Sequence, residues 1–220
     1  PANWLTQKNM VALARPVDLL IAKFGEMVKE NVPLAPYTSA RIGGPADIFI
    51  TVDSVAALAR VVKYLWKNDM PFLVMGGGSN LLVSDKGARG VVVLNRAKKV
   101  TFHAGNQPSV SAESGVVFSN LANRCASKGF GGIEWAAAVP GTIGGAVYGN
   151  AGAFGGDVAG SLLSTELLTE TGREKFSVEQ MGYGYRASLL KRGELKAIVL
   201  SAEFSLTNST KEDATVKIQQ

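Results

Sequence analysis

Apolar side chains recur at helical spacing in three parts of the chain. In residues 17–31 they follow one another every three or four positions, which is typical of an amphipathic helix. The shared face consists of Leu20, Phe24, Met27 and Val28. The same spacing predicts a helix that is capped by Asp53 or Ser54 and runs to about residue 68. A third helix is predicted over 116–128.

Short apolar segments bounded by turn residues predict the strands. They lie at 46–52, 71–75, 81–83, 91–94, 99–103, 108–113, 162–169, 174–176 and 197–206. We therefore expect an α+β fold of two lobes that meet near residues 95–100. The expected parts are an N-terminal extension and helix over 1–32, a first lobe over 33–97, a second lobe over 98–206, and the beginning of a further domain over 207–220, where a helix starts.

Composition fits a sizeable folded core and excludes several kinds of site. The chain has 220 residues, of which 46% are hydrophobic. A single cysteine excludes an internal disulfide framework, and a single histidine argues against a zinc site or a histidine-based triad. We expect Cys125 to be a buried structural thiol and His103 to be an ordinary surface residue.

Charge points to anionic partners without naming one. The formal net charge is +5, and basic chains bind nucleic acids, membranes or small polyanions. No basic block is long enough for a nucleic-acid arm. Residues 135–156 are uncharged and long enough to raise the question of a membrane span, but glycines, Pro140 and Asn150 favour a buried loop and helix. No secretory signal is visible, so we expect a cytoplasmic protein with no membrane or nucleic-acid partner and no evident obligate protein partner.

The first of two glycine-rich loops has the sequence MGGGSNL at residues 75–81. It follows the strand predicted over 71–75. It lacks the third glycine of a dinucleotide-binding fingerprint and the Gly-Lys-Ser/Thr of a P-loop. Gly76, Gly77 and Gly78 can bring backbone N–H groups close to an anion. Ser79 and Asn80 can add side-chain donors to a pyrophosphate. A tight turn without a ligand fits the same residues.

The second loop, at 140–156, has the sequence PGTIGGAVYGNAGAFGG. Its first three residues can open a short helix whose free N–H groups favour an anion. Gly144, Gly145 and Gly149 would leave one face of that helix nearly bare, which suits a flat ring or a packed backbone. Close packing between the two lobes fits as well.

Four separated segments resemble one known family. They are YTSARIGGPAD at 37–47, MGGGSNLLVSDKGARGVVV at 75–93, GIEWAAAVPGTIGGAVYGNAGAFGGDV at 132–158 and GYGYRASLLK at 182–191. Together they resemble UDP-N-acetylenolpyruvoylglucosamine reductase (UDP-N-acetylmuramate dehydrogenase) of the shorter type. The resemblance implies a two-lobed FAD-binding fold of the vanillyl-alcohol-oxidase type, with noncovalent FAD between the lobes. Gly76, Gly77, Gly78, Ser79 and Asn80 would surround the pyrophosphate, and the flavin side would be lined by Gly141, Thr142, Gly145, Ala146 and Asn150.

The resemblance also implies a reaction and its substrates. NADPH reduces FAD, and hydride then passes to the enolpyruvyl group of UDP-N-acetylglucosamine enolpyruvate, a step of peptidoglycan precursor synthesis. Arg186 matches the active-site arginine of the family, whose guanidinium can bind the substrate carboxylate through two parallel donors. Tyr185 would support Arg186 or contact the substrate. Without the resemblance, Tyr185 and Arg186 are an ordinary loop pair.

The family continues into a third domain that carries most of the UDP-sugar site, a proton-donating serine and a late glutamate. No matching serine motif is found here, so the chain is either a piece of a longer protein or a natural short relative. We favour the first and expect this chain to be the FAD-binding portion. Two alternatives stay open. One is another flavin oxidoreductase of this fold class, again with noncovalent FAD because His103 and Cys125 lie outside the glycine loops. The other is a non-catalytic nucleotide-binding module.

Overall fold

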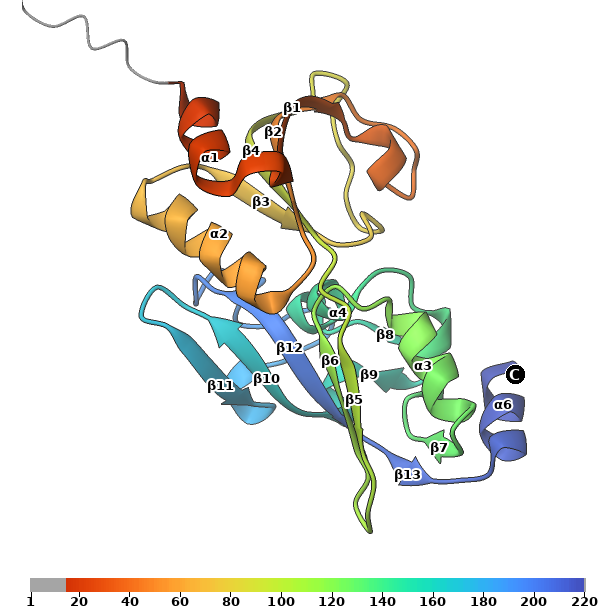
Figure 1. Cartoon of the computed structure of the whole chain (residues 1–220). Coiled ribbons are helices and arrows are strands. Elements are labelled where there is room, and N and C mark those ends of the chain that lie inside the picture. Colours follow the sequence, from red (N-terminus) through yellow and green to blue (C-terminus); the bar gives the residue numbers. More distant parts are fainter. Residues whose placement is uncertain (1–14, 220) are drawn as a thin grey trace, which may run out of the picture.

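The computed structural model describes residues 15–219, which form two β-sheets with helices packed around them (Figure 1). The first sheet has the order β1-β2-β4-β3. Its strands are β1 (Val28–Pro33), β2 (Pro45–Val52), β3 (Phe72–Met75) and β4 (Ala88–Asn95). β1 is antiparallel to β2, whereas β2, β4 and β3 run parallel. Parallel strands place their carboxyl ends at one edge, and the first glycine loop leaves the sheet there, after β3.

The second sheet has five strands in the order β11-β10-β12-β6-β5, and each pair is antiparallel. Its strands are β5 (Val100–His103), β6 (Ser109–Glu113), β10 (Leu162–Leu168), β11 (Arg173–Ser177) and β12 (Ile198–Ser205). Two short pairs complete the strands: β7 (Phe130–Gly131) with β13 (Thr207–Asn208), and β8 (Gly152–Ala153) with β9 (Gly156–Asp157). The sheet therefore changes between β4 and β5, although the exact lobe boundaries stay a prediction.

The helices predicted to about residue 68 and over 116–128 are present, whereas the helix predicted over 17–31 is shorter than expected. They are α1 (Pro16–Phe24), α2 (Val55–Lys67), α3 (Phe118–Ala126), α4 (Ile143–Gly149), α5 (Val158–Ser161) and α6 (Lys211–Gln219), with 3-10 turns η1 (Gly25–Met27), η2 (Ala35–Tyr37), η3 (Glu134–Ala138) and η4 (Glu179–Met181). The Ser54 hydroxyl oxygen caps α2 by accepting from the N–H of Ala57 at 3.3 Å. In the part of the chain that the structure describes, no helix is long and apolar enough to cross a membrane.

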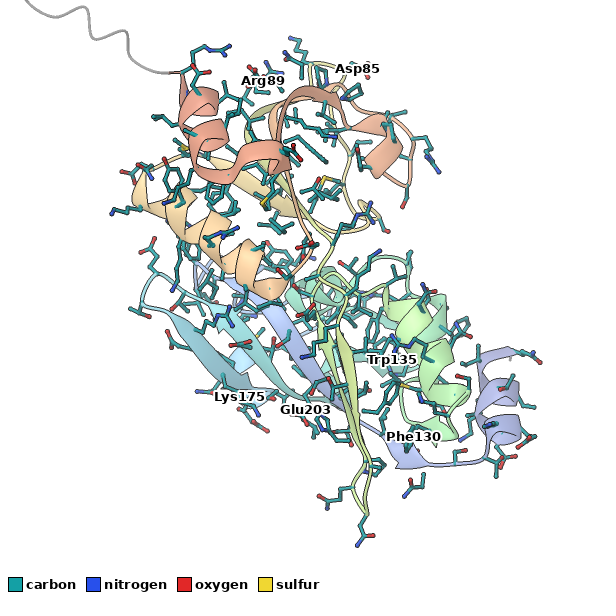
Figure 2. The ribbon with its side chains drawn as sticks, viewed as in Figure 1. Asp85, Arg89, Phe130, Trp135, Lys175 and Glu203 are labelled. Atoms are coloured by element: carbon teal, nitrogen blue, oxygen red, sulfur yellow. The ribbon has the colours of Figure 1, made fainter. Side chains whose placement is uncertain are left out.

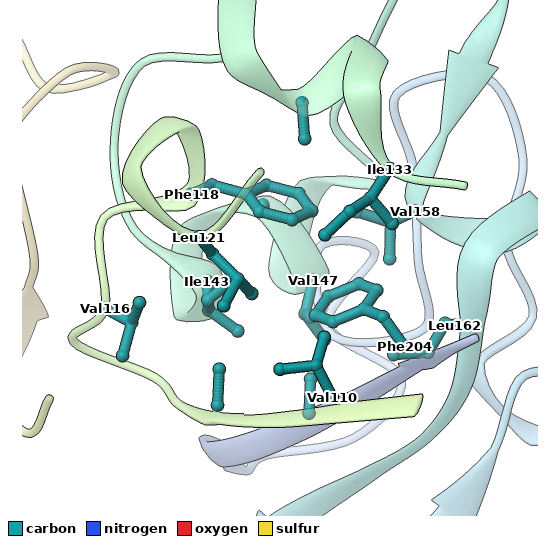
Figure 3. Close-up of a cluster of buried hydrophobic side chains, with 14 of the residues drawn as sticks. Val110, Val116, Phe118, Leu121, Ile133, Ile143, Val147, Val158, Leu162 and Phe204 are labelled. Carbon is teal, nitrogen blue, oxygen red and sulfur yellow. The ribbon is translucent and has the colours of Figure 1, made fainter. Parts of the chain in front are cut away.

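Helices α3 and α4 cover one face of the second sheet and enclose the larger core cluster (Figure 3). Phe118 of α3 packs against Phe204 of β12, with ring centroids 5.1 Å apart. Cys125 belongs to this core and is only 1% exposed, as predicted for a structural thiol. The other face carries polar side chains, among them Lys175 and Glu203, whose charged atoms lie 3.7 Å apart (Figure 2). His103 is exposed, and one of its ring nitrogens lies 3.0 Å from Ser111 Oγ, so the surface prediction is confirmed.

Helix α2 packs against both sheets. Its buried face includes Leu58, Val62 and Leu65, which contact the interior of the first sheet. The same cluster contains Leu168 of β10 and Leu200 of β12, both fully buried. Figure 1 shows α2 lying between the two sheets, so the helix joins them through one continuous hydrophobic cluster.

Two sequence predictions are wrong in this region. The helix predicted over 17–31 ends at Phe24, because Gly25 adopts a φ of 59° and the chain then forms β1 against β2. Val28 still faces the same core as Leu20 and Phe24, which explains why the spacing resembled a single helix. The predicted strand at 81–83 is a loop that packs on residues 43–45 and forms no ladder with a neighbouring strand.

Candidate cofactor site

The two glycine loops lie directly against each other. A Cβ atom at Gly76 would collide with the side chain of Thr142, and one at Gly77 would lie 3.4 Å from the Cα atom of Gly141. A Cβ atom at Gly141 would in turn lie 3.5 Å from Ser79 Oγ. Glycine is therefore needed at Gly76, because only a bare backbone allows the loop after β3 to reach the start of α4.

A third segment, at residues 37–44, packs against the first glycine loop and is hydrogen-bonded to it. Gly78 has a φ of 63°, and a side chain there would collide with the carbonyl oxygen of Tyr37. Ser39 donates its N–H to the Gly78 carbonyl at 3.3 Å and its hydroxyl to Ser79 Oγ at 3.2 Å. The motifs around residues 37–47, 75–80 and 141–142 thus form one continuous backbone surface.

That surface carries hydrogen-bond donors without protein partners. Among the described residues, none accepts a hydrogen bond from the backbone N–H groups of Gly76 to Asn80, nor from those of Gly141, Thr142 and Gly145. Gly78 and Thr142 are buried and the other residues of this set are half-buried or exposed, so the free N–H groups are open to water or to an external acceptor. Successive backbone N–H groups suit the oxygens of a phosphate or pyrophosphate. The donor set therefore suits a ligand that carries a phosphate or pyrophosphate group.

Helix α4 presents an open face beside these donors. A Cβ atom at Gly145 or Gly149, one turn apart, would meet no atom within 4 Å. Gly144 differs from the prediction, because a Cβ atom there would lie 3.1 Å from Ser114 Cβ. Gly144 therefore belongs to the packed side, and the bare face consists of Gly145 and Gly149. Thr142 and Ala146 are buried next to this face.

Arg186 lies at the tip of a tight turn. Gly184 and Ala187 exchange two backbone hydrogen bonds of 3.1 Å, which place Tyr185 and Arg186 at the centre of the turn. Arg186 adopts a φ of 53°, a conformation that costs free energy for a residue with a side chain and is enriched at functional sites. Its Nη2 donates to the carbonyl of Gly152 at 2.6 Å. Tyr185 is 94% exposed.

The segment that carries this turn is fastened to the end of α4. Tyr183 donates its hydroxyl to the Val147 carbonyl at 3.1 Å, and Ser188 donates its hydroxyl to the Tyr148 carbonyl at 2.6 Å. Burial raises the pKa of Tyr183 well above its ordinary value, with a smaller contribution from the charge of Asp157. The phenol therefore stays neutral and remains a donor. These bonds occupy two of the last four carbonyls of α4, which a helix otherwise leaves free.

Asn150 ends α4 in the left-handed conformation and is 4% exposed. Its Nδ2 donates to Asp157 Oδ2 at 3.2 Å and to the Gly184 carbonyl at 3.0 Å, while its Oδ1 accepts from the N–H of Ala159 at 3.0 Å. The structure thus brings Arg186, Tyr185 and the predicted α4 residues to one region through Asn150. The first glycine loop reaches that region through Gly141 and Thr142.

Sequence reasoning missed two residues of this arrangement. Lys191 donates its ammonium to the Arg186 carbonyl at 2.8 Å, and Ser39 binds the first glycine loop. Both lie inside segments that were recognised as motifs, at 182–191 and 37–47. Their position inside these motifs could have marked both residues as candidates. The contacts themselves could not be predicted, because Ser39 and Ser79 are distant in the sequence and the bond from Lys191 to Arg186 depends on the shape of a turn.

Comparisons with known proteins identify the family of this chain. The FAD binding domain family matches residues 46–175. UDP-N-acetylenolpyruvoylglucosamine reductase of Carboxydothermus hydrogenoformans is 39% identical over 209 residues, which is 94% of this chain and 68% of the relative. The chain belongs to the UDP-N-acetylenolpyruvoylglucosamine reductase family. The reductase of Bacillus pumilus is 40% identical over 204 residues, 92% of this chain and 66% of its own length. The chain therefore spans about two thirds of the curated relatives that it matches.

Solved structures confirm the predicted fold class. The reductase of Thermus caldophilus superposes with a TM-score of 0.69 at 29% identity and covers 86% of this chain and 66% of its own. An alkyldihydroxyacetonephosphate synthase matches with a TM-score of 0.61 at 20% identity, over 87% of this chain and 40% of its own, and shares the fold alone. With the family match, these likenesses confirm an α+β FAD-binding fold of the vanillyl-alcohol-oxidase type and the reductase resemblance.

Proposed function

We propose that this chain is the FAD-binding portion of a cytoplasmic, NADPH-dependent enzyme that reduces UDP-N-acetylglucosamine enolpyruvate to UDP-N-acetylmuramate for peptidoglycan synthesis. Membership of the reductase family supports the reaction class. The observation that carries the proposal is the pair of glycine loops, which meet at Gly76 and Thr142 and leave a set of backbone N–H donors without protein acceptors among the described residues.

In this proposal FAD binds noncovalently along the joined loops. The N–H groups of Gly76, Gly77, Gly78, Ser79 and Asn80 face the pyrophosphate, and the flavin lies along Gly141, Thr142, Gly145 and Ala146. Bound FAD supplies a carrier that accepts hydride from NADPH and delivers it to the enolpyruvyl substrate. Asn150, also predicted to bind FAD, has its side-chain donors and acceptor engaged with protein groups.

Arg186 binds the substrate carboxylate. One of its five N–H donors is held by the Gly152 carbonyl, which fixes the guanidinium beside the end of α4 and leaves further donors for a ligand. A fixed guanidinium stabilises the negative charge that grows on the carboxylate during reduction, because it does not need to reorganise as the charge develops. Tyr185, beside it in the turn and fully accessible, contacts the same substrate or supports the arginine.

An absorbance spectrum of the purified protein and a titration with FAD test the cofactor. We expect flavin absorbance that acid or heat releases, since the attachment is noncovalent. The reaction is tested by adding NADPH to the full-length protein, with and without the UDP-sugar. Flavin that is bleached by NADPH and reoxidised by the UDP-sugar supports the proposal. FAD binding without reoxidation by the UDP-sugar would favour another flavin oxidoreductase of this fold, and absence of FAD affinity would refute both.

A further inference from the structure

We propose that Asn150 is a positioning residue for Arg186 and does not itself bind the cofactor. This inference rests on the proposed function, because it concerns the arginine that binds the substrate carboxylate. Its basis is the hydrogen bonding of the Asn150 side chain, which is 4% exposed and bonded to three protein groups. A contact to FAD through this amide would require one of those bonds to break.

The first anchor acts on the backbone of Arg186. Asn150 Nδ2 donates to the carbonyl of Gly184 at 3.0 Å. Gly184 is also the residue that closes the turn, since it exchanges both backbone hydrogen bonds with Ala187 across Tyr185 and Arg186. Asn150 therefore ties the base of the arginine turn to the end of α4.

The second anchor acts on the guanidinium of Arg186. The same Nδ2 donates to Asp157 Oδ2 at 3.2 Å, and Asp157 pairs directly with Gly152 in the β8–β9 ladder. The Gly152 carbonyl is the acceptor that holds Arg186 Nη2 at 2.6 Å. One amide thus fixes both the turn that carries the arginine and the strand pair that orients its charged end.

Asparagine suits this position for two physical reasons. Its φ of 46° and ψ of 60° lie in the left-handed region, which asparagine tolerates better than most residues. Its amide also offers two donor hydrogens and an acceptor oxygen, and all three bonds are made here. An aspartate would keep the shape and the acceptor but would place a second carboxylate beside Asp157.

Hydrogen exchange tests the positioning in the chain without cofactor. Asn150→Gly keeps the left-handed backbone and removes only the side-chain bonds. We expect the amides of Gly184 and Ala187 to exchange on the order of tenfold faster, since their turn loses its anchor. Asn31→Gly is the matched control: Asn31 is also left-handed, with a φ of 52°, but is exposed in β1. This control should leave exchange of the arginine turn unchanged.

Flavin affinity and kinetics then separate positioning from cofactor binding. In the intact protein we expect Asn150→Gly to keep the FAD dissociation constant within about threefold while kcat falls at least about tenfold, the result of a misplaced arginine. Asn150→Asp, which retains the shape and the bond from Ala159, should give the same pattern and serves if the glycine variant folds poorly. Weakened FAD binding with unchanged exchange at Gly184 and Ala187 would overturn the proposal. If the parent protein binds no FAD, the proposed function fails, but the exchange experiment still decides the structural part.

Discussion

The open face of α4 predicts that one substitution raises stability and weakens cofactor binding together. Gly145 lies in the first turn of α4, and a Cβ atom there would meet no atom within 4 Å. Replacing a helical glycine by alanine stabilises a protein by about 0.5–1 kcal/mol when the conformation is compatible. For a domain of this size that gain raises Tm by about 1–4 °C. The Gly145→Ala protein without FAD should therefore be slightly more stable than the parent.

The same methyl group occupies the surface on which we place the flavin. Extra carbon atoms in a closely packed contact cost typically about 1–3 kcal/mol, which corresponds to about 5- to 150-fold in Kd. The assay is thermal unfolding of the cofactor-free protein followed by titration with FAD. Gly144→Ala is the internal contrast: its methyl group would lie 3.1 Å from Ser114 Cβ, so it should gain less stability than Gly145→Ala. FAD affinity unchanged in Gly145→Ala, together with the expected gain in Tm, would show that the flavin does not lie on this face.

Arg186→Ala should lower kcat by about 100- to 1,000-fold and leave FAD bound, because it removes charge stabilisation and no cofactor contact; parallel loss of flavin in an absorbance spectrum would indicate a structural role instead. Ser54→Ala removes the cap of α2 and should cost about 1 kcal/mol, lowering Tm by about 2–4 °C without changing FAD affinity, and an unchanged Tm would contradict the cap. Burial raises the pKa of Cys125 to about 12. The unfolded thiol has a pKa of about 8.5 and loses its proton above that pH, whereas the folded protein keeps it. The free energy of unfolding therefore falls as the pH rises from about 9 to 12, by up to about 1.4 kcal/mol per pH unit. Cys125→Ala should reduce the slope of that part of the profile in urea unfolding, although Tyr183 still contributes to it; equal slopes in both proteins would refute the assignment.

Local sequence patterns were sufficient to predict elements whose structure depends on residues close together in the chain. Ser54 capped α2 as expected, and the alternating segments around Val110 and Phe204 formed strands whose apolar side chains face the core. The glycine loops could also be located in the sequence, because clustered glycines mark places where the backbone comes close to another group, although a tight turn or close packing explained them equally well. These elements depend on residues close together in the sequence.

The errors arise where distant segments meet. Val28 looked helical by spacing, but the antiparallel pairing with Ile50 in β2 determines its strand, and Gly25 ends the helix before it. Gly144 could not be separated from Gly145 by sequence, since only the contact with Ser114 distinguishes the packed side of α4 from the open side. The partners of Asn150 lie up to 34 residues away, so its engaged amide could be seen only after folding.

The position of α2 has a consequence for how the whole chain unfolds. Its buried face is shared by the first sheet and by Leu168 and Leu200 of the second, so neither half can melt without exposing apolar surface of the other. We therefore expect a single cooperative transition instead of two separate ones. The contacting glycine loops, one from each half, would then keep a fixed separation, and hinge motion between the halves would not be needed to admit a ligand.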